Sequence, residues 1–253
     1  MNTEIIKLPK APLQEVIFEV RWDLDISKET NQLFDSEFDI AVGIMYSNIK
    51  KDFKLLKQKL PEGIQFPQEF LNYQTIYQYW TGENLWPVLQ LGPGVFTVNE
   101  TEKNYQWFKH YFPLVKKSLT WLQKAYNKEL NYNFASLKYI DKVNVKDYDF
   151  KDWLSFIRKN LNINIENKFD TRGKLKQFNF SQVFELDDSS ELHLNIINGK
   201  NDKQEDILVW ETSIIKLVNF NQKNLIKWLE NSHTITSKLF KEICKDEFYN
   251  HFT

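Results

Sequence analysis

The 253-residue sequence contains a single cysteine, Cys244. One cysteine excludes an intramolecular disulfide and any zinc or redox site built on paired thiolates. Such sparing use of cysteine is typical of a reducing compartment. The N-terminal residues hold no uninterrupted apolar stretch that could act as a signal peptide, and no segment is apolar for long enough to cross a bilayer. We therefore predict a cytoplasmic protein without a membrane partner.

Arginine is also scarce, occurring only as Arg21, Arg158 and Arg172, and the formal net charge is −1. Nucleic-acid binders usually gather Lys and Arg on one face and use Arg for bidentate phosphate contacts. The lysines at positions 50, 51, 54 and 57 form a local cluster, but their spacing is typical of the solvated face of an amphipathic helix. The composition argues against nucleic acid as the partner.

Glycine, proline and methionine are few, at seven, seven and two residues, whereas the chain holds 20 Phe, 11 Tyr and 8 Trp. Few turn-forming residues and many flat, stiff side chains predict a rigid aromatic interior. An AT-rich genome would impose a similar bias on any protein, and this second explanation stays open. The hydrophobic fraction of 42% is that of a globular chain able to bury a sizeable core.

Alternation of apolar and polar residues predicts the strands. The clearest case is 13–23, where every second residue from 16 to 22 is Val, Phe, Val or Trp. Glycine and proline at Gly92-Pro93-Gly94 predict a bend that folds its strand into a hairpin. Similar runs, rich in β-branched and aromatic residues, lie at 75–81, 85–100, 135–145, 175–186, 191–198 and 207–218.

Apolar residues at three- and four-residue steps predict helices over 39–60, 104–127, 152–161 and 222–247. Pro113 is expected to split the second helix. The resulting order is β-α-β-β-α followed by β-α-β-β-β-α. We predict an α+β fold with an antiparallel sheet covered by helices. It forms a single domain over 1–253, and its structural halves, 1–130 and 131–253, are candidates for a pseudo-duplicated β-α-β-β-α arrangement.

Three segments carry a family resemblance: PLQEVIFEVRW, LQLGPGVFTVNET and SLKYIDKVNV. With NSHTITSKLF in the last helix, they make nearly the whole chain resemble a sporadically distributed, uncharacterised prokaryotic protein family. The third motif of that family often reads LRYIN, so Lys138 and Asp141 depart from its basic and amide residues. The resemblance implies no activity or cofactor. The scattered occurrence of the family implies a mobile cassette, such as one for anti-phage defence.

Charged residues on the first strand are candidates for a ligand pocket. Alternation places Glu15, Glu19 and Arg21 on one side of the strand, joined by Asp23 and Asp25 if the strand continues. Carboxylates that share a cleft can do acid–base work or bind a hard cation. The alternative is a solvated face on which Arg21 pairs with a neighbouring acid.

The second half of the chain adds Tyr139, Asp141 and His233 to this candidate pocket. His233 falls on the apolar stripe of the last helix, where an imidazole is a ligand, a base or a hydrogen-bonded core group. The histidines lack metal-ligand spacing, and the LGPG turn matches no phosphate-loop pattern, so neither a metal nor a cofactor is predicted. Cys244 lies near a helix end, where the dipole disfavours a thiolate.

Four tryptophans are candidates for an interface: Trp80, Trp86, Trp107 and Trp121. Aromatic side chains dominate binding hot spots, although their spacing also fits core packing. Because no catalytic motif is found, we predict a non-enzymatic recognition or accessory protein that binds another protein, or a second copy of itself. The alternative is a small-ligand or nucleotide-binding domain with a pocket between sheet and helices, with or without hydrolysis of the ligand.

Overall fold

The computed structural model describes residues 8–60, 66–170, 172–218 and 220–253. Within these residues, five α-helices accompany a nine-stranded antiparallel sheet, which confirms the predicted α+β class. The strands follow the order β4-β5-β6-β7-β1-β8-β11-β10-β9. Their bounds are β1 Leu13–Trp22, β4 Leu55–Gln58, β5 Tyr77–Gly82, β6 Leu85–Gly92, β7 Val95–Thr101, β8 Tyr132–Asn144, β9 Asn179–Glu185, β10 Glu191–Lys200 and β11 Asp206–Lys216. A separate two-stranded ribbon joins β2 (Asp25–Ile26) to β3 (Leu33–Phe34).

The chain divides into two compact units whose segments interleave. Unit 1 comprises Met1–Gln14, Lys138–Ile214 and Glu230–Thr253, and unit 2 comprises Glu15–Leu137 and Ile215–Leu229. Each unit therefore takes residues from both predicted halves. Duplication of the halves stays a prediction.

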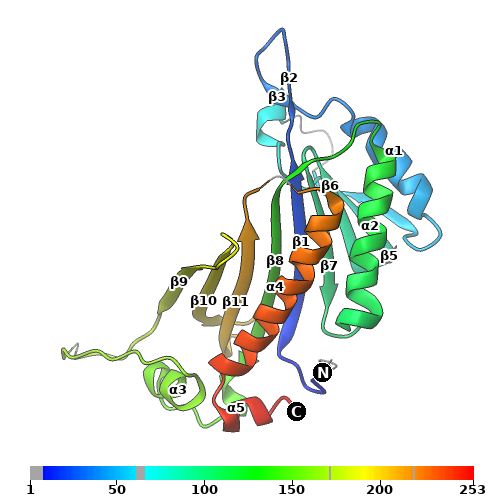
Figure 1. Cartoon of the computed structure of the whole chain (residues 1–253). Coiled ribbons are helices and arrows are strands. Elements are labelled where there is room, and N and C mark those ends of the chain that lie inside the picture. The colour runs from blue at the N-terminus through cyan, green and yellow to red at the C-terminus, as the bar shows by residue number, and fades with distance from the viewer. Residues whose placement is uncertain (1–7, 61–65, 171, 219) are drawn as a thin grey trace. The chain divides into compact units, whose positions relative to one another are not determined.

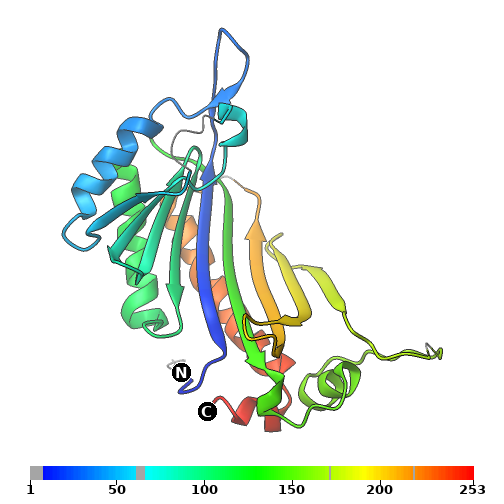
Figure 2. The ribbon, with the colours of Figure 1, turned by 180° about the vertical axis from the view of Figure 1, so that it is seen from behind.

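In unit 2, helices α1 (Phe38–Ile49) and α2 (Phe112–Ala125) lie on one face of the strands (Figure 1). The alternation of β1 explains this packing, because Val16, Phe18, Val20 and Trp22 are all buried. Two tyrosine hydroxyls form hydrogen bonds between helices and strands of this unit. Tyr79 of β5 donates to the carbonyl of Val42 in α1, and Tyr111, just before α2, donates to the carbonyl of Val98 in β7. The opposite face of β6, β7 and β1 is seen in front in Figure 2, with α2 behind the strands.

In unit 1, α3 (Trp153–Asn160), α5 (Asp246–Asn250) and the second part of α4 (Gln222–Ile243) enclose an aromatic core. Trp210 of β11 and Phe248 of α5 lie at its centre, with ring centroids 6.4 Å apart. The Asp152 side chain caps α3 by accepting from the backbone N–H of Ser155. The predicted aromatic interior is thus present in this unit as ring-on-ring packing.

Several predicted boundaries are confirmed. Gly92-Pro93-Gly94 separates β6 from β7, which pair as a hairpin. Pro113 stands in the first turn of α2, preceded by a π-helical turn, Trp107–Tyr111. At the start of α4, the Asn221 side chain accepts from the backbone N–H of Asn224 and so caps the helix.

The predicted helix over 39–60 is wrong after Ile49. Residues 55–58 form β4, which pairs with β5, because the free backbone groups of that neighbouring strand satisfy those of β4. Lys57 consequently lies on a strand and not on a helix face. The register places Lys57 opposite Gln78. Helical spacing of leucines alone could not reveal this tertiary pairing.

The last predicted helix, 222–247, is also wrong at its C-terminal end. Helix α4 ends at Ile243, and Cys244 forms an isolated antiparallel bridge with Leu161. The backbone and side-chain N–H groups of Asn162 donate to the carbonyls of Ile243 and Glu242, at 2.8 Å each. Because these contacts satisfy carbonyls that would otherwise be orphaned, a segment 80 residues away in sequence ends the helix.

Candidate binding surface

The helix-free face of unit 2 carries a row of amide side chains that crosses four strands. The strand register places Gln78 of β5, Gln90 of β6, Asn99 of β7 and Glu15 of β1 on this face, opposite the buried Tyr79, Leu89, Val98 and Val16. The register aligns Gln78 with Gln90, and Gln90 with Thr97, which precedes Asn99 by two residues on the same face. These residues lie in one hydrogen-bonding row.

Four hydrogen bonds connect this row, which we call the amide chain. The indole N–H of Trp80 donates to Gln78 Oε1 at 3.2 Å. The side-chain N–H group of Gln78 donates to Gln90 Oε1 at 3.0 Å, and that of Gln90 donates to Asn99 Oδ1 at 3.1 Å. Asn99 Nδ2 then donates to Glu15 Oε1 at 2.8 Å. Every link donates in the same direction, from Trp80 toward Glu15.

The two ends of the amide chain fix this direction. An indole nitrogen can only donate, so Gln78 presents its oxygen to Trp80 and its NH₂ group to Gln90. An ionised carboxylate can only accept, so Asn99 presents its NH₂ group to Glu15. Hydrogen bonds aligned in this way polarise one another and are strengthened by a charged acceptor. The chemistry of the terminal groups therefore holds the intervening amides in single orientations.

Side branches complete the hydrogen bonding of the buried middle. Asn99 and Thr97 are each 4% exposed, and the Thr97 hydroxyl donates to Asn99 Oδ1 at 2.6 Å. Lys59 Nζ and the Thr75 hydroxyl each lie 3.4 Å from Gln90 Oε1. Because a buried amide without partners costs free energy, these additional hydrogen bonds stabilise the arrangement and keep it rigid.

Aromatic and charged groups flank the Trp80 end. Trp86 meets Trp80 edge to face, with ring centroids 5.6 Å apart, and Lys57 Nζ lies 5.6 Å from the centroid of the Trp80 ring. Both tryptophans are partly exposed. This end therefore offers an apolar platform with a cation beside it.

An ion pair and further rings lie farther along β1 on the same face, toward Trp22. Arg21 Nε lies 2.6 Å from Glu19 Oε1, so two of the predicted pocket residues do pair. The Arg21 guanidinium stands 4.5 Å from the centroid of Phe134 and 5.7 Å from that of Tyr73. Asp23 and Asp25 do not extend the acidic row, because β1 ends at Trp22 and Asp25 begins the ribbon strand β2.

The predicted interface tryptophans do not share one surface. Trp80 and Trp86 lie at the amide chain. Trp107 is 4% exposed and stacks on Phe112, so its place in an interface is corrected to a core position. Trp121 belongs to α2, where it meets Phe53 edge to face under the ammonium group of Lys117.

The other predicted pocket residues, Tyr139, Asp141 and His233, all belong to unit 1. The Tyr139 hydroxyl and His233 Nδ1 lie 2.9 Å apart in hydrogen-bond contact. Burial lowers the pKa of His233 to about 3, so the imidazole is neutral at physiological pH. A neutral, buried and hydrogen-bonded histidine has the properties of the core group that the sequence left as an alternative.

Asp141 is a buried carboxyl group in the same unit. It is 6% exposed, and burial raises its pKa to about 7. Burial, followed by the nearby charge of Asp141, raises the pKa of Cys244 to about 12. The cysteine is thus a thiol at neutral pH, which disfavours nucleophilic chemistry.

Unit 1 also contains a pocket of about 280 Å³ near α3 and α5. None of the six predicted pocket residues lines it. Tyr148 and His251 meet edge to face in its wall, with centroids 5.1 Å apart. Its lining residues are Lys146, Asp147, Tyr148, Asp149, Lys159, Asn160, Glu247, Phe248 and His251.

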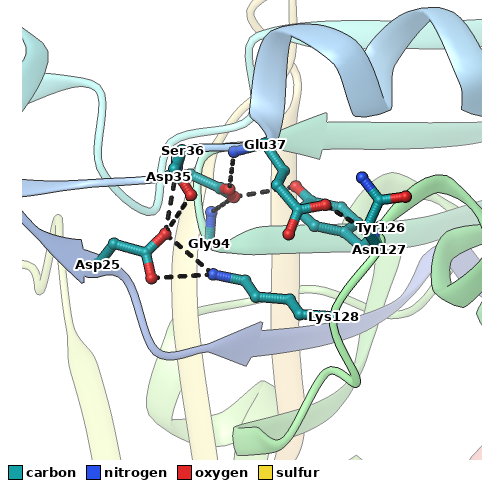
Figure 3. Close-up of polar contacts among 8 residues, drawn as sticks. All are labelled: Asp25, Asp35, Ser36, Glu37, Gly94, Tyr126, Asn127 and Lys128. Atoms are coloured by element: carbon teal, nitrogen blue, oxygen red, sulfur yellow. Dashed lines mark hydrogen bonds and ion pairs between the residues drawn. The ribbon is translucent and has the colours of Figure 1, made fainter.

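A second acidic cluster in unit 2 holds loops together (Figure 3). Asp35 Oδ2 accepts from the backbone N–H of Gly94 at 3.1 Å and from the Tyr126 hydroxyl at 2.9 Å. Asp25 accepts from the Ser36 hydroxyl at 2.5 Å and pairs with Lys128 Nζ at 3.0 Å. The hydrogen bond from Ser36, and then Lys128, lower the pKa of Asp25. Because its carboxylates already have protein partners, the cluster is structural, and no group suited to a metal ion occurs among the described residues.

Sequence reasoning found Glu15, Glu19, Arg21 and Trp80 but missed the amides between them. Gln78, Gln90 and Asn99 are neutral and scattered over three strands. Gln78 and Gln90 are polar members of an apolar alternation, as in Leu89-Gln90-Leu91, and that pattern could have placed each on the face opposite its neighbours. Asn99, between Val98 and Glu100, gives no such signal. Only the strand order could have joined them.

Comparison with known protein families, characterised proteins and solved structures finds no match to this chain. In the described part of the chain, no helix is both long and apolar enough to cross a bilayer.

Proposed function

We propose that this chain is a non-enzymatic recognition protein that binds another protein through the amide chain and its flanking residues. The observation that carries this proposal is the rigid row of hydrogen bonds from Trp80 to Glu15. Both ends of the row are partly exposed, while Asn99 in the middle is buried. A surface held in one arrangement before binding loses little conformational entropy when a partner docks.

The flanking groups define the chemistry of the partner. Trp80 and Trp86 suit an apolar or aromatic side chain, because paired indoles form a typical hot-spot platform. Glu15, of which Oε1 accepts from Asn99, suits a Lys or Arg side chain at the opposite end, whereas Glu19 already pairs with Arg21. We therefore propose a polypeptide segment that presents an apolar residue and a cation, separated by the width of the strands between Trp80 and Glu15.

The test compares capture by three tagged forms of the full chain: wild type, Trp80→Ala and Ile40→Ala. Ile40 is exposed on α1, so its truncation is a matched apolar loss away from the amide chain. A protein captured near stoichiometry by wild type and Ile40→Ala, but at least about tenfold less by Trp80→Ala, supports the proposal. Purified partner must then bind directly with the same order of affinities. Equal capture by all three forms contradicts the assignment of this surface.

The resemblance to a scattered prokaryotic family supports a narrower role, as a sensor or accessory component of a mobile anti-phage cassette. The same capture is therefore made from healthy and phage-challenged cells. A partner that appears only after challenge supports sensing. A partner captured equally from both supports a constitutive accessory role, and capture from neither contradicts protein recognition altogether.

The pocket of about 280 Å³ favours small-ligand binding as a second candidate function. The Tyr148–His251 pair supplies an aromatic wall suited to a nucleobase. The lining also holds two lysines, Lys146 and Lys159, which pair with Glu205 and Asp149 in the free protein, together with three carboxylates. A nucleotide, which would have to displace these ion pairs, is the probe to use. Isothermal titration with ATP should then give binding that Lys159→Ala weakens. Absence of heat at millimolar ATP rejects this candidate.

A further inference from the structure

Strand β9 leaves one edge of the sheet open. It is the last strand in the sheet order, and among the described residues it pairs with β10 alone (Figure 1). Most of its residues are exposed, including Val183 at 54% and Phe184 at 45%. An exposed strand edge is a template for a further strand.

The hairpin geometry shows which backbone groups point outward. The backbone N–H of Leu186 donates to the carbonyl of Ser190 at the turn, which makes that pair a hydrogen-bonded one. Hydrogen-bonded and non-hydrogen-bonded pairs alternate along an antiparallel ladder. Phe184 and Gln182 therefore bond to β10, and the N–H and C=O groups of Val183 and Ser181 point to the open edge.

The two edges of the sheet differ in protection. The edge strand β4 has only four residues, and Lys54, Lys57 and Lys59 lie in or beside it. Lysines and short length are the usual devices that block edge-to-edge pairing. Strand β9, NFSQVFE, has seven residues and contains no lysine, arginine or proline. Of the two edge strands of the nine-stranded sheet, β9 therefore lacks the short length and the lysines that protect β4.

We propose that β9 pairs antiparallel with β9 of a second copy of this chain, which makes a two-fold symmetric dimer with a sheet continuous across the interface. An antiparallel strand pair is self-complementary, so one strand can serve as both partners. We place the two-fold axis at Gln182. The facing pairs are then Gln182 with Gln182, Val183 with Ser181, Phe184 with Phe180, and Glu185 with Asn179 of the second copy.

This register agrees with the side chains. Phe184 meets Phe180 of the second copy as an aromatic cross-strand pair, which is stabilising. The one charged residue of the strand, Glu185, faces an amide and not a like charge. The outward N–H and C=O groups of Val183 and Ser181 meet as hydrogen-bonded pairs. A second copy therefore satisfies the backbone and the side chains of the edge together.

Charge substitution at the two-fold axis tests the proposal. Gln182 is exposed in the isolated chain, so Gln182→Lys and Gln182→Glu should fold normally, as circular dichroism can verify. Either variant alone places like charges directly opposite one another, and we expect dimerisation to weaken about tenfold or more. Mixing the two variants places opposite charges together and should restore a heterodimer. Gln182→Thr is the neutral control and should remain dimeric.

Sedimentation velocity over a concentration series measures these states. Wild-type protein that remains monomeric at about 100 μM overturns the proposal, because a specific dimer of biological use has a dissociation constant below that concentration. A dimer that Gln182→Lys leaves unchanged also overturns it, since the interface would then lie elsewhere. This result is independent of the amide chain, because Trp80→Ala should leave the dimer intact.

Discussion

Asp141 brings a titratable group into the interior of unit 1. Its pKa in the folded protein is about 7, above the ordinary value of 3.8, because burial penalises the charged form. A raised pKa means that the folded state holds the proton more tightly than the unfolded state. The stabilising contribution is therefore complete below about pH 4 and is lost as the pH rises through about 7.

Replacing Asp141 tests this pH dependence. We expect the unfolding free energy of wild type to fall by on the order of 4 kcal/mol between about pH 4 and pH 8. In Asp141→Asn this fall should be absent, because the amide does not titrate. Urea unfolding at several pH values measures it. The exposed Asp187→Asn is the control and should follow wild type. Parallel curves for wild type and Asp141→Asn would contradict the buried titration.

Gly92 is a position where no side chain fits. A Cβ atom added there would lie 1.8 Å from the carbonyl oxygen of Gln74, whereas one added to Gly43 in α1 meets nothing within 4 Å. We expect Gly92→Ala to lower the free energy of unfolding by about 3 kcal/mol, because the backbone must move. Gly43→Ala should raise it by up to about 1 kcal/mol through helix propensity. Thermal unfolding that ranks the two variants otherwise would be inconsistent with this packing.

At the scale of elements, the amide chain joins strands by side chains in addition to the backbone ladder. Asn99 is the buried link between β7 and β1, and its NH₂ group is directed at Glu15. Substitution by Asp would place two carboxylates together. The strand arrangement is thus sensitive to a change of one atom, because nitrogen is replaced by an oxygen that cannot donate.

We expect Asn99→Asp to lower the free energy of unfolding by about 2 to 4 kcal/mol, through a buried unpaired charge and repulsion from Glu15. Adding Glu15→Gln to that variant should recover part of the loss, because the new amide can donate to the new carboxylate. Glu15→Gln alone should cost about 1 kcal/mol. Chemical denaturation of the four proteins forms a double-mutant cycle. An additive result would show that the two side chains do not interact.

At the scale of the whole molecule, the proposed β9 dimer is held by backbone hydrogen bonds and aromatic pairs. No ion pair joins its facing residues. We therefore expect its dissociation constant to change less than about threefold between about 0.05 and 0.5 M NaCl. The heterodimer of Gln182→Lys with Gln182→Glu should weaken with salt over the same range, because its restored contact is ionic. Sedimentation at both salt concentrations measures the difference.

The sequence determined the elements and which residues share a strand face. Alternation along 13–22 placed Glu15, Glu19 and Arg21 opposite the buried Val16, Phe18 and Val20, and the structure agrees. Proline and glycine located the β6–β7 hairpin and the start of α2. These features depend on a residue and its near neighbours, and so the local pattern suffices.

Only the tertiary structure decided which residues far apart in the sequence contact one another. Glu15 and Asn99 are 84 residues apart in sequence, and only the pairing of β1 with β7 brings them together. The same holds for the end of α4 at Asn162, for the conversion of 55–58 from helix to strand, and for the open edge at β9. Periodicity reports the face on which a side chain lies. The side chain that it meets there follows from strand order, which the free energy of the whole fold selects.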